Sequence, residues 1–197
     1  PDTAPARLEV WPKAFPAQEI PPDSPIQDVF HILAGDETRN RRIAEDVLTS
    51  YREGRKVLVL TERTDYLPLL REALGDEIKH CFVLHGRLSK KQRAAVLAEL
   101  EALDESVPRV LLATGRLIGE GFDHPPLDTL VLAMPISWKG TLQQYAGRLH
   151  REHADKQDLR IYDYAETDQP QLNRMWNKRQ RGYRAMGYEI KPVETVF

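Results

Sequence analysis

Two arginines near residue 150 have the spacing expected of a polyanion-binding site. Arg148 and Arg151 stand three positions apart in residues 144–151, and on a helix this spacing puts both guanidinium groups on one face. Neighbouring guanidinium groups repel each other unless an anion lies between them, and each planar group can bond two phosphate oxygens. A triphosphate is therefore one candidate ligand. Ion pairing with Glu152 or Asp155 explains the spacing equally well, so both interpretations stay open.

A glycine-rich segment upstream offers a second place where a ligand could approach the backbone. Residues 113–125 read ATGRLIGEGFDHP, and we expect a strand up to Thr114 followed by a loop with three glycines. Glycine allows close approach of a backbone to a ligand. The carboxylate of Asp123 could accept a hydrogen bond from a ribose hydroxyl or hold a water molecule. Taken alone, the segment is more typical of a long connection between two strands.

The apolar pattern of the chain predicts a scaffold for these segments. Five short apolar segments, three of them continuously apolar, alternate with stretches of helical periodicity. Strands buried on both faces have this character, which favours a parallel α/β sheet flanked by helices. The expected strands are residues 56–61, 81–85, 110–114, 129–134 and 159–164. The expected helices are residues 26–33, a stretch between the cap at 35–38 and Gly54, and residues 65–74, 90–103, 142–151 and 169–186.

Proline is concentrated at the beginning of the chain. Seven of the 14 prolines lie in residues 1–25, which predicts an extended arm or a linker. Residues 8–11 alternate in polarity and could form a strand, although no partner for it is evident. We therefore expect an arm over residues 1–25 and one folded domain over residues 26–197, with a long helix near its C-terminus.

In parallel α/β sheets, ligands bind beyond the carboxyl ends of the strands. Three expected strands are followed two residues later by an arginine, and a fourth is followed by Trp138 and Lys139. Arginine can hold a phosphate there, although most arginines are simply solvated. Trp138 could equally stack a base or pack against the last helix. The candidate residues at these ends are Thr61, Arg63, His85, Gly86, Arg87, Thr114, Gly115, Arg116, Trp138 and Lys139.

The composition excludes a uniformly basic protein. The 197 residues include 28 basic and 30 acidic side chains, a formal net charge of −2. The last helix carries a basic stripe of Arg174, Lys178 and Arg181, which a solvated face explains better than a nucleic-acid path. His150 and His153 lack the further ligands of a zinc site, so no metal site is predicted. The single cysteine suits a reducing compartment such as the cytoplasm, and no apolar run approaches the ~20 residues of a membrane span.

The order of these segments resembles the second RecA-like lobe of superfamily 2 helicases and translocases. Residues 57–61 match the region of motif IV, and His85-Gly86 follows the second strand as in that lobe. Residues 113–125 match motif V. The pattern Gln-x-x-Gly-Arg-x-x-Arg at residues 144–151 matches motif VI and is the most specific of the set. The resemblance covers about residues 40–165 and implies a RecA-like parallel sheet.

The resemblance also implies roles for individual residues. Arg148 and Arg151 would be arginine fingers on the γ-phosphate of ATP, with Gln144 nearby, while Gly121 and Asp123 would line the nucleotide cleft. The turns after the strands would bind the phosphates of one nucleic-acid strand without reading its sequence. The chain has no Gly-x-x-x-x-Gly-Lys-Ser/Thr loop, so ATP and Mg²⁺ would be bound mainly by the protein's own N-terminal lobe, upstream of this sequence.

Two departures from the DEAD-box pattern restrict which group of superfamily 2 the chain resembles. DEAD-box RNA helicases begin motif VI with His-Arg where this chain has Gln144-Tyr145, and their motif V is one residue shorter between the threonine and Gly-x-Asp. We therefore expect another superfamily 2 group and favour DNA over RNA. In a full-length protein the chain would belong to an ATP-dependent helicase, and by itself it would be inactive. The alternative is a non-enzymatic nucleic-acid-binding module that retains the fold.

Overall fold

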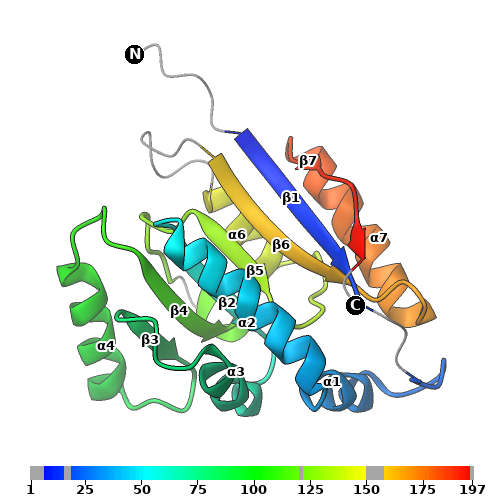
Figure 1. Ribbon diagram of the computed structural model, residues 1–197, viewed down its shortest axis with the longest axis horizontal. Coiled ribbons are helices and arrows are strands. Elements are labelled where there is room, and N and C mark those ends of the chain that lie inside the picture. The colour runs from blue at the N-terminus through cyan, green and yellow to red at the C-terminus, as the bar shows by residue number, and fades with distance from the viewer. Residues whose placement is uncertain (1–6, 16–18, 120–121, 150–157, 196–197) are drawn as a thin grey trace.

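All strands of the described residues belong to one parallel sheet of eight strands. The computed structural model describes residues 7–15, 19–119, 122–149 and 158–195. The strands are β1 (Arg7–Ala14), β2 (Lys56–Thr61), β3 (Cys81–Leu84), β4 (Arg109–Thr114), β5 (Thr129–Leu132), β6 (Asp158–Ala165), β7 (Glu189–Ile190) and β8 (Glu194–Thr195). Their order is β3-β4-β2-β5-β6-β1-β7, with β8 also paired to β1 (Figure 1). The expected parallel α/β fold is confirmed.

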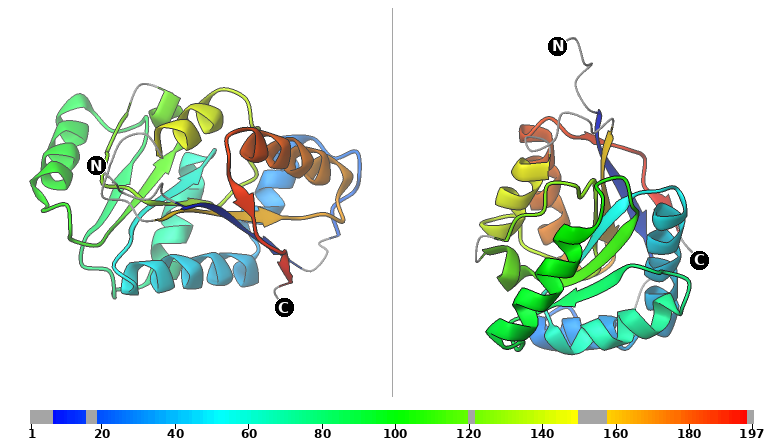
Figure 2. Two further views of the ribbon diagram at one scale, coloured as in Figure 1. Left: turned by 90° about the horizontal axis from the view of Figure 1, so that it is seen from above. Right: turned by 90° about the vertical axis from the view of Figure 1, so that its left-hand side faces the viewer.

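Helices cover both faces of the sheet, as the two views of Figure 2 show. Their bounds are α1 (Ile26–Ala34), α2 (Glu37–Arg52), a 3-10 turn (Thr64–Tyr66), α3 (Leu67–Leu74), α4 (Lys90–Ala102), α5 (Gly115–Gly119), α6 (Thr141–Leu149) and α7 (Pro170–Ala185). The first three α-helices pack on one face. The other α-helices pack mainly on the opposite face, so two apolar cores lie on either side of the sheet.

Strand β2 shows why the continuous apolar segments fold in this way. Val57 and Val59 enter the core beneath α1–α3, while Leu58 and Leu60 enter the core on the other side. All four side chains are fully buried or nearly so. Because successive side chains of a strand point to opposite faces, only a strand covered on both sides requires apolar residues at every position.

The segment expected as an arm supplies a strand of the sheet. β1 pairs in parallel with β6 along all eight residues, and Val10 is completely buried. Pro12 has no N–H to donate, but β7 pairs with residues 9–10 of β1 and β8 with residues 13–14, so Pro12 lies between the two pairings. The prolines therefore did not exclude a strand here. That residues 1–25 connect to a preceding lobe stays a prediction.

Two further differences from the expected elements concern the carboxyl ends of the strands. Residues 115–119 form the short helix α5 where a glycine-rich loop was expected, and β5 ends at Leu132 rather than at residue 134. The other expected strands and helices are present within one or two residues of their expected bounds wherever the structure describes them. In the described part of the chain, no helix combines the length and the apolar character needed to cross a bilayer.

Candidate functional site

The strand order brings the expected turns together along one edge of the sheet. In the β2–β4 register Thr61 pairs with Thr114, and in the β3–β4 register Leu84 pairs with Ala113. On the other side of β2, Leu60 pairs with Leu132 of β5. The turns at residues 85–87, 114–116, 61–63 and 135–139 therefore follow one another along this edge, which we call the carboxyl edge.

The β3–β4 end of the carboxyl edge exposes two arginines. Arg87 follows a tight turn in which its backbone N–H donates to Nδ1 of His85 over 3.1 Å. Arg116 lies in α5, and its side chain passes close to Gly86. A Cβ added at Gly86 would lie 3.9 Å from Cδ of Arg116. Both arginines and Gly86 are exposed. The sequence-predicted residues of these two turns thus lie together, and both arginine side chains are exposed at the surface.

Two of the predicted residues, Thr61 and Thr114, are buried beneath the surface of the carboxyl edge, and a third, Arg63, forms an ion pair with a neighbouring carboxylate. Thr61 and Thr114 are buried, and Oγ1 of Thr61 accepts a hydrogen bond of 3.3 Å from the backbone N–H of Arg63. The guanidinium of Arg63 donates to both carboxylate oxygens of Asp65, at 3.0 and 2.8 Å, and these hydrogen bonds lower the pKa of Asp65. The threonines therefore shape the turns, and a phosphate at Arg63 has to compete with Asp65.

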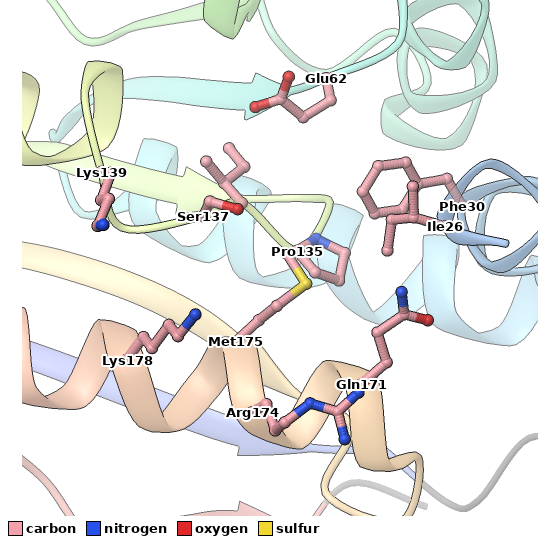
Figure 3. Close-up of a pocket in the computed structure, with 11 residues that line it drawn as sticks. Ile26, Phe30, Glu62, Pro135, Ser137, Lys139, Gln171, Arg174, Met175 and Lys178 are labelled. Carbon is pink, nitrogen blue, oxygen red and sulfur yellow. The ribbon is translucent and has the colours of Figure 1, made fainter. Parts of the chain in front are cut away.

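At the β2–β5 end, the carboxyl edge opens into a cavity of about 470 Å³ (Figure 3). Glu62 lies at its far side, and its Oε1 atom would be 3.3 Å from a Cβ added at Gly115. Partial desolvation raises the pKa of Glu62. The wall is completed by Ser137 after β5 and by Gln171 on α7. Sequence reasoning missed these three residues, since no cation, glycine or motif marks them as ligand-binding.

Trp138 packs against α7. Its ring meets the Tyr183 ring edge-on, with the centroids 5.1 Å apart, and a Cβ added at Gly182 would lie only 2.0 Å from its Cε2 atom. The packing alternative for Trp138 is therefore confirmed, although the half-buried ring also lines a second cavity of about 530 Å³. Lys139 beside it is exposed and lines both cavities.

A buried ion pair fixes α7 to the sheet beside these cavities. Arg179 is 1% exposed and donates to the two carboxylate oxygens of Asp163 in β6, at 2.8 and 2.9 Å, and to the carbonyl oxygen of Ile136 at 3.0 Å. The hydroxyl of Tyr183 donates to Asp163 as well. Burial, together with the charge of Asp163, raises the pKa of Tyr183, so the phenol remains a hydrogen-bond donor. This network sets the distance between α7 and the residues after β5.

Among the residues predicted to face a nucleotide, Gln144 lies on α6 and Asp123 lies in the connection between α5 and β5, and helices α5 and α6 contact each other. Gln144 and Asp123 are exposed. Leu142, Tyr145, Ala146 and Leu149 form the buried face of α6. Arg148 lies in α6 one turn after Gln144, but its side chain is outside the described residues. Gly121, Arg151, His150 and His153 also lie outside the described residues.

The comparison with protein families decides the kind of domain. Residues 39–153, more than half of the chain, match the model of the helicase conserved C-terminal domain. This chain belongs to that family. The resemblance read from the motif order is therefore confirmed, including the RecA-like form of the sheet.

Relatives of this helicase C-terminal domain include viral proteins. Transcript termination protein A18 of fowlpox virus is 26% identical over 141 residues, which cover 68% of this chain and 29% of the viral protein. Uncharacterized protein 108L of invertebrate iridescent virus 3 is 38% identical over 82 residues, which cover 42% of this chain and 74% of that protein. The chain thus spans less than a third of the fowlpox virus protein.

Solved structures share the fold at low sequence identity. The structure of UvsW from T4 matches 97% of this chain and 41% of its own, with a TM-score of 0.72 and 15% identity. The C-terminal domain of the DEAD-box protein Dbp5 matches 95% of this chain and 89% of its own, with a TM-score of 0.56 and 16% identity. These similarities concern the fold alone.

Proposed function

We propose that this helicase C-terminal domain is the second motor lobe of an ATP-dependent nucleic-acid helicase or translocase. The carboxyl edge carries the proposal. Parallel pairing aligns four turns there, and Arg87, Arg116 and Lys139 expose cationic groups along it. Contacts of this kind bind phosphates and position a strand without reading bases. Among the solved relatives, Dbp5 has been seen bound to RNA and ADP BeF3, which agrees with a nucleic-acid partner.

The nucleotide part of the proposal rests on α6 and the loop after α5. Gln144 on α6 and Asp123 in the loop after α5 are both exposed and offer hydrogen-bonding groups that suit the phosphate and ribose ends of ATP, and α5 contacts α6. Arg148 and Arg151 would supply arginine fingers when a second lobe closes over the nucleotide. Such fingers accelerate phosphoryl transfer by ~10³–10⁵ because they stabilise transition-state charge. Binding of ATP and Mg²⁺ mainly by an N-terminal lobe stays a prediction.

We favour DNA as the partner, because motif VI begins with Gln144-Tyr145 rather than with His-Arg. Competition between DNA and RNA oligonucleotides of the same sequence, measured by fluorescence anisotropy on this chain, tests the preference. Tighter binding of RNA would contradict it. The substitutions Arg87→Gln and Arg116→Gln should each weaken binding of a short DNA oligonucleotide, while Lys91→Gln on the exposed side of α4 should not.

The catalytic role is tested by ATP hydrolysis. The chain by itself should not hydrolyse ATP, with or without nucleic acid. In a protein that joins it to a lobe with a phosphate loop, Arg151→Ala should abolish turnover and largely spare ATP binding, whereas Arg184→Ala should leave turnover unchanged. Loss of ATP binding with normal residual turnover per bound nucleotide would refute the arginine-finger role. Unchanged hydrolysis would favour the non-enzymatic nucleic-acid-binding alternative.

A further inference from the structure

Two adjoining cavities form a groove between α7 and the residues that follow β5. They measure about 470 and 530 Å³ and share Ser137, Lys139, Met175 and Lys178 as lining residues. On α7 the lining extends from Gln171 to Gly182. We call this hollow the α7 groove. Because its first cavity begins at Glu62, the groove continues directly from the carboxyl edge.

The α7 groove is lined by four cationic side chains. Lys139, Arg174, Lys178 and Arg181 are all exposed. In the part of the chain that the structure describes, none of them forms an ion pair or side-chain hydrogen bond. Among the described residues that line the two cavities, Glu62 is the one carboxylate. Helix α7 contains no aspartate or glutamate, so no carboxylate three or four positions away within the helix can neutralise these cations.

The cations have a regular placement. Arg174, Lys178 and Arg181 follow one another at i, i+4 and i+7 along α7, and Lys139 extends toward Lys178 from the opposite wall (Figure 3). The distance from Arg174 to Arg181 along the helix axis is about 10 Å, at ~1.5 Å per residue. A strand with duplex-like stacking advances about 3.4 Å along its axis per phosphate, so this length accompanies about three nucleotides.

The floor of the α7 groove is apolar. Ile26, Phe30 and Met175 contribute to the first cavity, and Met175 with Trp138 to the second. Trp138 is fixed by Gly182 and Tyr183, so its remaining surface presents a rigid aromatic platform. A positively charged groove combined with apolar and aromatic surfaces is how proteins bind single-stranded nucleic acid without sequence preference.

We propose that the α7 groove holds the continuation of the nucleic-acid strand as unpaired nucleotides, with phosphates on Lys139, Lys178 and Arg181 and bases over Met175 and Trp138. The proposal rests on the proposed function, because it takes the carboxyl edge as the place where the strand enters. It extends the binding site by about three nucleotides, at ~3.4 Å per phosphate. The basic stripe of α7, which the sequence explained better as a solvated face, thereby becomes part of the strand path.

The experiment measures binding of short and long fluorescent oligothymidylates, about 4 and about 16 nucleotides, to this chain by anisotropy over a range of salt concentrations. The test variant is the double substitution K178Q/R181Q. The control is Arg184→Gln, which neutralises an exposed arginine of α7 that does not line the groove. Circular dichroism confirms that each variant is folded.

We expect the double variant to lose affinity for the long oligonucleotide only. Each single-strand phosphate contact contributes about −0.7 to the slope of log K against log salt, so two lost contacts should reduce the magnitude of the slope by ~1.4. With equal affinities at about 1 M salt, this change lowers the affinity at 0.1 M salt by roughly 25-fold. The short oligonucleotide, which the carboxyl edge can bind alone, should be unaffected by K178Q/R181Q and weakened by Arg116→Gln.

Three outcomes would overturn the proposal. If the double variant and R184Q bind the long oligonucleotide equally well, with the same salt slope, the groove does not hold the strand. In that case, weaker oligonucleotide binding by R116Q would still support the proposed function. If polyglutamate binds the groove and oligothymidylate does not, the partner is an acidic protein segment. If neither oligonucleotide binds the unsubstituted chain, the proposed function and this inference both fail.

Discussion

A single methyl group added at Gly182 should disturb the proposed binding surface of the α7 groove. A Cβ at residue 182 would lie 2.0, 2.2 and 2.5 Å from Cε2, Cδ2 and Nε1 of Trp138, far inside van der Waals contact. The ring belongs to a connection that is held against α7, so Gly182→Ala must displace Trp138. Displacement also breaks the edge-on contact between Trp138 and Tyr183.

The expected magnitude follows from three contributions. Overpacking in a closely packed site costs about 1–3 kcal/mol, and loss of the aromatic pair about 0.5–1.5 kcal/mol. Alanine in place of glycine inside a helix gains about 1 kcal/mol. The substitution should therefore destabilise the chain by roughly 0.5–3.5 kcal/mol. With Trp138→Ala already present, only the helix gain remains, so Gly182→Ala should then stabilise the chain by about 1 kcal/mol.

Urea denaturation tests whether the effect of Gly182→Ala on the free energy of unfolding changes sign when Trp138→Ala is present. Gly35→Ala serves as a control for the loss of a glycine, because a Cβ there would make ordinary contacts of 3.5 Å or more. Oligonucleotide affinity should fall in Gly182→Ala together with stability, since Trp138 lines the α7 groove. Equal destabilisation by Gly182→Ala with and without Trp138 would refute the reasoning that the ring occupies the space beside residue 182.

Two further predictions concern charged side chains. Arg179→Gln should destabilise the chain by about 3–5 kcal/mol in urea denaturation, because Asp163 would be left buried without its counter-ion. Adding Asp163→Asn should recover part of this loss of stability. A destabilisation by Arg179→Gln of less than about 1 kcal/mol would contradict the prediction. Glu62→Gln should tighten oligonucleotide binding by removing a carboxylate that lines the α7 groove. The raised pKa of Glu62 means that a falling pH protonates it earlier than an ordinary glutamate, so the affinity of the unsubstituted chain should approach that of Glu62→Gln as the pH falls from about 7 to about 4.5. Parallel pH profiles for the two proteins would contradict this.

Much of the sheet was predictable because its information is local. A strand buried on both faces must be apolar at nearly every position, and residues 57–60 and 110–113 carry that pattern whatever their neighbours are. β1 was not recognised as part of the sheet, because its partner β6 is about 150 residues away and its prolines suggested an extended arm. No local signal reports such a distant pairing.

Some features of the candidate site could likewise be predicted from the sequence, and others depend on the tertiary structure. Residue types and motif order were enough to select Arg87, Arg116 and Lys139, since each follows a recognisable strand. Whether a selected side chain is available was beyond the sequence: Thr61 is buried and Arg63 is engaged with Asp65. Hydrogen-bond partners of this kind depend on turn geometry rather than on residue type.

The sequence by itself determined that the chain forms a parallel α/β domain with helicase motifs in order, because alternation, capping and motif spacing are properties of short segments. Only the tertiary structure decided which basic residues of α7 are accessible at the surface and which are buried. Arg179 and Arg181 are two positions apart, yet one is buried against Asp163 and the other is exposed beside the α7 groove. The rotation of a helix about its axis is set by the surfaces packed against it, and these come from strands distant in the sequence.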